Sequence, residues 1–268
     1  MKNMTYGIYL RNPLISAARA ISTSALLPLL MLSSLLTFSQ VAAADTQVKT
    51  GVHEQTEVAG DPAARHLAYS TVFNDAVAND LNGNPQAARQ GYDLLLGTEF
   101  AGQVATPSAI NLAVLNRFDE SKTAFRHLAD GKNTQEAQYA SLWQLWLTAR
   151  TWTGSSAALQ KQLTKDTAKY HFTYPRYQAI ARLYAGKGSP DAIFSAVKSM
   201  PETSPLAKGD AVTEATFFTG GYLQYVAHNN NAAQKLYERE KNALNRTSLE
   251  KPLIDKATAT LLATNHKL

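Results

Sequence analysis

Apolar residues along most of the chain recur every three or four positions, which is the spacing of one face of an α-helix. From Asp61 onward alanine and leucine occupy these positions, and the alternating β-branched pattern of strands is scarce. Helix-breaking residues divide this region into segments of about 10 to 18 residues. The breaks fall at Asn82–Pro85, Thr106–Pro107, Gly131, Gly154–Ser155, Gly186–Pro190, Pro201–Pro205, Asn229–Asn231 and Pro252. The pattern predicts an all-α fold of roughly eleven helices and no strand.

Several of these breaks carry the residues that begin a helix. Asn84 and Ser189 each precede a proline, and proline is tolerated at the first helical position. Thr134 precedes Gln135-Glu136, and Ser248 precedes Leu249-Glu250, so both are predicted N-caps. We expect a final capping helix from Ser248 to Asn265, with Pro252 in its first turn.

A loose internal repeat runs through the helical region. A small or turn residue is followed five positions later by a small residue and nine positions later by an aromatic residue or leucine. The matching triplets are Gly83, Ala88 and Tyr92; Asn116, Ser121 and Phe125; Ala227, Ala232 and Leu236; and, less closely, Gly154, Leu159 and Leu163. Their spacing lies near the 34-residue tetratricopeptide repeat. Because each helix pair of such a repeat leaves an apolar face for its neighbour to cover, we expect a tetratricopeptide-like α-solenoid of four to five pairs over residues 61–268.

The N-terminal region has the pattern of a secretory signal peptide. Lys2, Arg11 and Arg19 precede an uncharged run from Ala25 to Phe38, and small residues end at Ala44. The run is shorter than the ~20 residues of a spanning helix, so we expect cleavage near Ala44 and no membrane span afterwards. Residues 45–60 are polar and without period, which predicts a flexible leader. These features favour a periplasmic or secreted protein.

Composition excludes several kinds of chemistry. The 268 residues contain no cysteine, which rules out disulfides, thiolate metal sites and a lipid-modified N-terminal cysteine. The net charge of +5 falls to +2 once residues 1–44 are set aside, because those residues hold three bases and no acid. This balance does not favour nucleic-acid binding.

Motifs for catalysis are largely missing. No two histidines stand at i,i+4, and Ser195-x-x-Lys198 lacks the ordered partner motifs of a serine nucleophile. Asp119-Glu120 and Glu238-x-Glu240 would have to lie in a cleft to act as a glycosidase pair, and charged helical turns favour a solvated surface. We therefore expect no enzyme activity, no cofactor and no metal, with a peptidoglycan-cleaving enzyme as the less favoured alternative.

The C-terminal half resembles a known family. Ser141-Leu142-Trp143 follows one repeat-like pair, an irregular pair surrounds Gly186, and Glu214-Ala-Thr-Phe-Phe-Thr-Gly220 comes after it. This order resembles the NlpI-type periplasmic tetratricopeptide adaptors over roughly residues 105–241. The resemblance implies an adaptor that docks cell-envelope enzymes, and it implies a homodimer. The family's lipidated cysteine is absent here.

The repeat register also predicts a binding face. The first helices of the pairs in a tetratricopeptide array line a concave groove, and our register places six residues there: Phe73, Val77, Gln144, Thr148, Phe217 and Gln224. Amides and aromatic rings suit a bound peptide. We expect a scaffold that recruits a cell-envelope enzyme or a secretion component through this face. The alternative within the same fold is a structural accessory subunit of a pilus or secretion machine.

Overall fold

The computed structural model describes residues 61–131, 134–201 and 204–265. The chain divides into two compact units, Met1–Leu67 and Ala68–Leu268. Of the first unit only residues 61–67 are described, so the predicted signal peptide, its cleavage at Ala44 and the leader 45–60 lie outside the described residues. The account below concerns the second unit.

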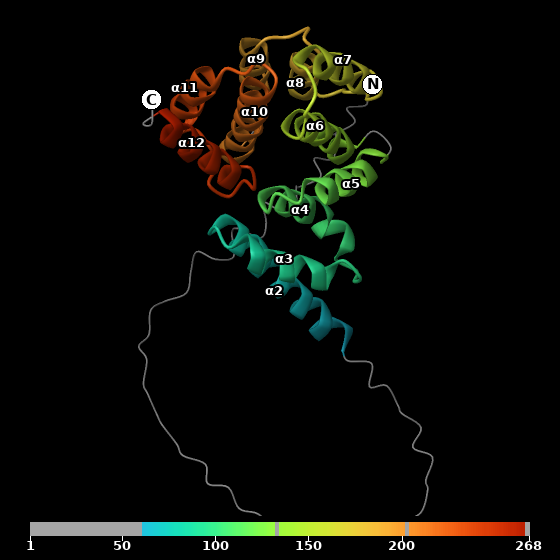
Figure 1. Cartoon of the computed structure of the whole chain (residues 1–268). Helices are drawn as coiled ribbons and strands as arrows, with labels where there is room; N and C mark the ends of the chain where they lie inside the picture. Colours follow the sequence, from blue (N-terminus) through green and yellow to red (C-terminus); the bar gives the residue numbers. More distant parts are fainter. Residues whose placement is uncertain (1–60, 132–133, 202–203, 266–268) are drawn as a thin grey trace, which may run out of the picture. The chain divides into compact units, whose positions relative to one another are not determined.

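The regular secondary structure of the described residues is all helical, as the periodicity predicted, and these residues contain no strand (Figure 1). Eleven helices follow one another along them: α2 (Pro62–Leu81), α3 (Pro85–Leu95), α4 (Ala101–Val114), α5 (Phe118–Ala129), α6 (Gln135–Arg150), α7 (Ser156–Thr167), α8 (Pro175–Tyr184), α9 (Pro190–Lys198), α10 (Pro205–Tyr225), α11 (Asn230–Glu240) and α12 (Lys251–Asn265).

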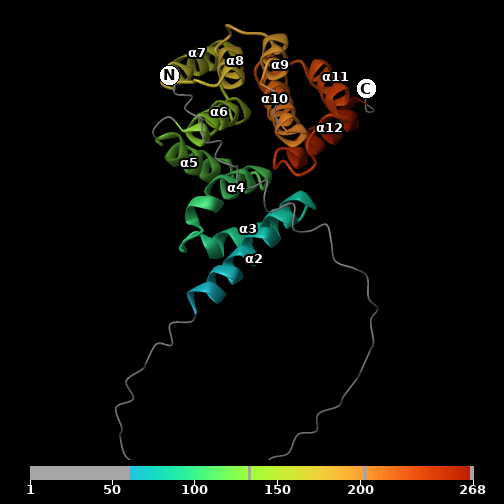
Figure 2. The same cartoon turned by 180° about the vertical axis from the view of Figure 1, so that it is seen from behind.

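Neighbours in the sequence are neighbours in space. From α3 to α12 every helix packs against the next one, so α4/α5, α6/α7, α8/α9 and α10/α11 form successive pairs (Figures 1 and 2). The helices that open the later pairs also pack on one another: α6 on α8, α8 on α10, and α10 on α12. In addition α6 packs directly against α10, which brings together two helices that are four elements apart.

Residues with a left-handed backbone conformation lie in four of the turns that join one helix to the next. Gly83, Asn116, Gly186 and His228 have φ values of 78°, 60°, 71° and 50°. This region favours glycine and tolerates asparagine, so the predicted turns at Gly83, Asn116 and Gly186 are confirmed. The last turn was predicted one residue early, because His228 and not Ala227 adopts the left-handed conformation.

Counting from the observed turns, the small residue and the aromatic residue fall at the same places in three pairs. All six of these side chains are buried: Ala88 and Tyr92, Ser121 and Phe125, and Ala233 and Tyr237. In the last pair the predicted Ala232 is only half-buried, and Ala233 takes the interior position. The repeat spacing is therefore real, with its final unit shifted by one residue.

Helix starts follow local chemistry. The hydroxyls of Thr134, Ser155, Ser189 and Ser204 each accept the N–H of the third residue beyond, as does the side-chain oxygen of Asn229. The last helix begins at Lys251, three residues later than predicted. Ser248 caps nothing, because its hydroxyl donates to the Glu250 carboxylate instead.

The predicted break at Thr106–Pro107 is wrong, because Pro107 lies inside α4. An interior proline costs a helix about 3 kcal/mol. Here α4 is buried along most of its length, from Thr106 to Ala113. Burial of this apolar surface on both sides of the proline outweighs the lost backbone bond.

An aromatic cluster joins α5, α6 and α10. The ring of Trp143 stacks on Phe125 at 4.9 Å and lies 4.7 Å from Phe217, which is also 5.1 Å from Trp146. Two glycines of α10 allow close packing, one against α6 and the other against α11. A Cβ atom at Gly221 would overlap the indole of Trp146, and one at Gly220 would overlap the ring of Tyr237 in α11.

Candidate functional site

The six residues predicted to line a groove do not lie together. Phe73 and Val77 are buried core residues of α2, and Phe73 packs on Phe100 with ring centroids 6.4 Å apart. Phe217 is 3% exposed and belongs to the aromatic cluster. These three side chains are therefore not presented to a partner on the surface of the free chain. Whether the set binds a partner stays a prediction.

Gln144 and Thr148 of α6 line a groove. Gln144 is largely buried and its Nε2 donates to the carbonyl of Lys122 at 2.6 Å, while Thr148 is half-buried. Phe217 and Gln224 of α10 instead line a second, smaller pocket. The six predicted residues are therefore divided among the groove, the smaller pocket and the core.

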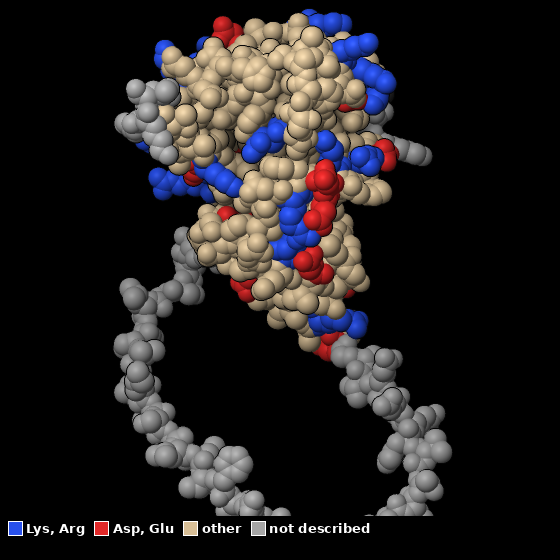
Figure 3. All heavy atoms as spheres, viewed as in Figure 1, with Lys and Arg blue, Asp and Glu red and all other residues tan. Residues whose placement is uncertain are grey.

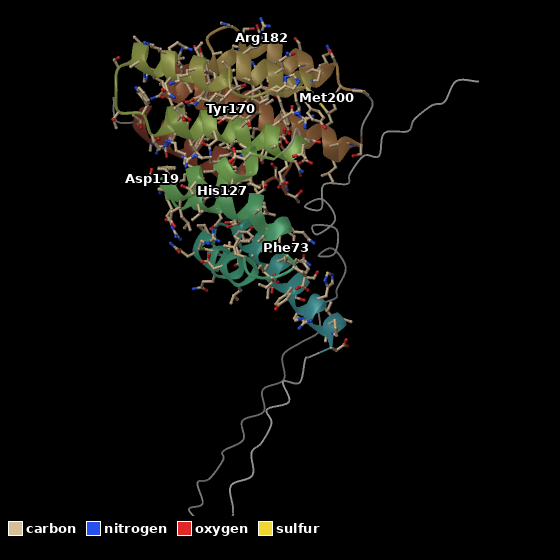
Figure 4. The ribbon with its side chains drawn as sticks, turned by 90° about the vertical axis from the view of Figure 1, so that its right-hand side faces the viewer. Phe73, Asp119, His127, Tyr170, Arg182 and Met200 are labelled. Carbon is tan, nitrogen blue, oxygen red and sulfur yellow. The ribbon has the colours of Figure 1, made fainter. Side chains whose placement is uncertain are left out.

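The larger of the two is a groove of about 870 Å³ between α5 and α7, with α6 as its floor. One wall comes from α5, the other from α7 and the segment after it, and the α6–α7 turn closes one end. Its lining residues are Lys122, Arg126, Ala129, Asp130, Gln144, Thr148, Thr151, Trp152, Thr153, Gly154, Gln162, Asp166, Lys169 and Tyr170. Figure 4 looks at this side of the molecule and labels His127 on α5 and Tyr170 beyond α7.

Hydrogen bonds fix much of the lining of this groove. Lys122 Nζ donates to Thr151 Oγ1 at 3.1 Å. On the opposite wall Asp166 accepts from Gln162 at 2.8 Å and pairs with Lys169 at 2.6 Å. The groove therefore offers charges of both signs on side chains that are already positioned.

Tyr170 and Arg126 line opposite walls of the groove. Burial raises the pKa of the Tyr170 phenol, Asp166 and Asp130 raise it further, and Arg126 lowers it. The Trp152 indole donates to the Ser155 carbonyl at 3.1 Å, which holds its ring at the closed end. Aromatic faces and an arginine at one groove are features of peptide-binding surfaces.

The smaller pocket lies on the face made by α4, α6, α10 and α12. Its volume is about 120 Å³. The repeat register predicts a concave groove along the first helices of the pairs, which include α6 and α10. Only a small pocket is left on this face, because α6 packs directly on α10 and α12 packs on α10 as well, with Lys256 Nζ 3.4 Å from the Val114 carbonyl of α4.

Arg150 is the central charged group of this pocket. Its guanidinium carbon lies 5.0 Å from the ring of Phe118 and 5.1 Å from the ring of Tyr225. Cation–π contacts of this length hold the side chain in place while leaving the N–H edge available. Gln224 lies nearby and accepts the Tyr237 hydroxyl at 3.0 Å.

Sequence reasoning missed a buried group of acids where α6, α8, α10 and α12 meet. Glu250 is 4% exposed and accepts from the hydroxyls of Tyr139 and Ser248. Glu214 pairs with Arg176 at 3.2 Å. Burial raises the pKa of Glu214 from 4.5 to about 7 against the opposing effect of Arg176, and burial also raises the pKa of Glu250. These groups do not line either pocket; the Arg176–Glu214 pair joins α8 to α10, and the hydrogen bond from Tyr139 joins α6 to the residue just before α12.

The acids considered for catalysis lie elsewhere. Asp119, Glu120 and Glu238 are exposed, and Glu120 is paired with Arg117 at 2.5 Å. The hydrogen bond from Arg117 lowers the pKa of Glu120. Within residues 61–131, 134–201 and 204–265, no three acids or histidines gather in a way that would hold a metal ion.

Charge on the described surface is mixed. On the face shown in Figure 3, lysine and arginine are interspersed with aspartate and glutamate and separated by uncharged residues. None of the described helices is both long and apolar enough to cross a membrane.

Comparison with known proteins gives no identification. No family model matches the chain, and no curated protein matches it. The resemblance to the NlpI-type adaptors therefore rests on the residue patterns given above.

Proposed function

We propose that this protein is an exported, tetratricopeptide-like adaptor that binds a segment of a partner protein in the groove between α5 and α7. The observation that carries the proposal is the groove itself, about 870 Å³ in volume, open along one side and lined by positioned polar groups. The predicted binding residues Gln144 and Thr148 lie in it.

The lining suits an extended polypeptide. A peptide backbone presents one N–H and one C=O per residue, so its partners must include both acceptors and donors. Asp130 and Asp166 supply acceptors, and Arg126, Lys169 and the Tyr170 hydroxyl supply donors. Trp152 and Tyr170 add aromatic surface on which side chains of the partner would pack.

The array also supports a scaffolding role. Three of the helix pairs share one spacing of turn, small residue and aromatic residue, and α12 covers the end of the array as a capping helix would. Together with the signal-peptide pattern, this favours a tetratricopeptide-like solenoid working in the periplasm. A cell-envelope enzyme or a secretion component is the partner that the NlpI-type resemblance favours.

The proposal is tested by affinity capture with the full chain, expressed with a C-terminal tag and purified after export. Thr148→Arg places a large charged side chain on the groove floor. Thr123→Arg is the matched control, because Thr123 is exposed on α5 and does not line the groove. Circular dichroism establishes that both variants are folded.

We expect a discrete partner with the unmodified chain and with Thr123→Arg, and its loss with Thr148→Arg. Retention of the same partner by Thr148→Arg would refute the assignment of the groove. Recovery of the chain only as a fixed-stoichiometry component of a large assembly would favour the accessory-subunit alternative.

A further inference from the structure

The small pocket beneath α12 has an unbalanced charge. Among the described residues that line it are two cations, Arg150 and Lys256, and no acid. The acids nearest in sequence do not compensate them. Asp119 follows Phe118 but does not line the pocket, and Asp255 is paired with Lys251 at 2.6 Å.

Two aromatic rings hold Arg150 in position. It is half-buried between the rings of Phe118 and Tyr225, and its guanidinium has no hydrogen-bond acceptor within the described part of the chain. Contacts with aromatic rings leave the N–H donors at the edge of the planar guanidinium available. Two of these donors can form parallel hydrogen bonds to one carboxylate.

Gln224 adds an oriented donor. Because its Oε1 accepts the Tyr237 hydroxyl at 3.0 Å, its Nε2 is left to donate, and no acceptor for Nε2 occurs among the described residues. Lys256 uses one donor on the Val114 carbonyl at 3.4 Å and keeps two. Three side chains from α6, α10 and α12 thus bring donors to one pocket.

Apolar and aromatic side chains make up most of the remaining wall, with Asn116 and Thr260 as further polar residues. Trp146, Phe217 and Leu253 line the pocket, and its volume of about 120 Å³ admits only a compact group. We propose that this pocket binds a carboxylate attached to a small apolar body, with the carboxylate on Arg150, Gln224 and Lys256. Such a group reaches the pocket either as a free organic acid or as the end of a polypeptide chain. The site is separate from the α5–α7 groove, so this inference goes beyond the adaptor function.

The test compares two probes of nearly the same shape, 3-methylbutanoate and 3-methylbutanamide, which differ in charge. The exported full chain is titrated with each, and the indole N–H signal of Trp146 is followed by NMR after assignment with Trp146→Tyr. To test the end of a polypeptide chain as the ligand, acetyl-Gly-Gly-Leu is titrated as the free acid and as the C-terminal amide.

We expect the acids to shift the Trp146 signal with millimolar affinity and the amides to bind at least about tenfold more weakly. Arg150→Gln should weaken binding of the acid. Lys256→Gln, a change at an exposed position, should weaken it as well. Arg246→Gln, which removes an exposed charge outside the pocket, should not. Binding of the tripeptide acid would identify chain ends as ligands, and binding of 3-methylbutanoate alone would identify free acids.

Equal binding of acid and amide, full binding by both Arg150→Gln and Lys256→Gln, or no shift with any of the acids at about 20 mM would overturn the proposal. Thr148→Arg should bind the acid normally, which separates failure at this pocket from failure at the groove.

Discussion

Replacing Gly220 by alanine tests the packing of α10 on α11. Gly220 lies in the buried part of α10, and a Cβ atom there would overlap the Tyr237 ring. Tyr237 is 4% exposed and its hydroxyl is bonded to Gln224, so the ring has little room to move aside.

Two opposing effects set the size of the change. Glycine to alanine inside a helix normally stabilises by about 1 kcal/mol. Overpacking a buried contact costs about 1–3 kcal/mol, and loss of the Tyr237 hydrogen bond costs about 1 kcal/mol more. We therefore expect Gly220→Ala to lower the free energy of unfolding by about 1–3 kcal/mol, which for a domain of this size lowers the melting temperature by about 3–10 °C.

Gly102→Ala is the matched control for thermal and urea unfolding followed by circular dichroism. Gly102 lies in α4, and an added Cβ would meet no atom within 4 Å. This variant should be more stable than the unmodified chain by a few tenths to about 1 kcal/mol. If Gly220→Ala were also as stable as the unmodified chain or more so, the close packing of α10 on Tyr237 would be refuted.

Two further predictions come from the structure and a third from the sequence. Because burial holds the pKa of Glu214 at about 7 when folded against 4.5 when unfolded, the folded state binds a proton that the unfolded chain has released. Stability should therefore fall by up to about 3 kcal/mol as pH rises from 4.5 to 7, and urea unfolding of Glu214→Gln should show a smaller pH slope. An equal slope in both proteins would contradict this. Phe217→Ala should cost about 3–5 kcal/mol because the ring is 3% exposed, whereas Thr148→Ala should change the unfolding free energy by less than about 1 kcal/mol. Equal effects of the two substitutions would place Phe217 outside the core. The intact mass of the exported chain should begin at Asp45, and a chain that keeps residues 1–44 would contradict cleavage after Ala44.

Local signals in the sequence predicted most of the helices. N-caps such as Thr134 and Ser189 and turn residues such as Gly83 act on their immediate neighbours, so their effects are readable from the sequence. Pro107 misled the prediction because burial of α4 by other helices overrides a local preference.

The candidate site depended on contacts that no local pattern carries. The direct packing of α6 on α10 fills the expected groove, and it depends on Gly221 of α10 and Trp146 of α6, which are far apart in sequence. Glu250 is buried because Tyr139, more than a hundred residues earlier, supplies a hydrogen bond. A one-residue shift at His228 was enough to move the last unit of the predicted register.

Site-specific photo-crosslinking tests partner binding in the α5–α7 groove most directly. The photoreactive residue p-benzoylphenylalanine is placed at Thr153, an exposed position in the groove, or at Lys187, an exposed position outside it. We expect a discrete protein adduct from Thr153 that is absent from Lys187 and abolished by Thr148→Arg. Absence of an adduct at Thr153, or the same adducts from both positions, would contradict the account.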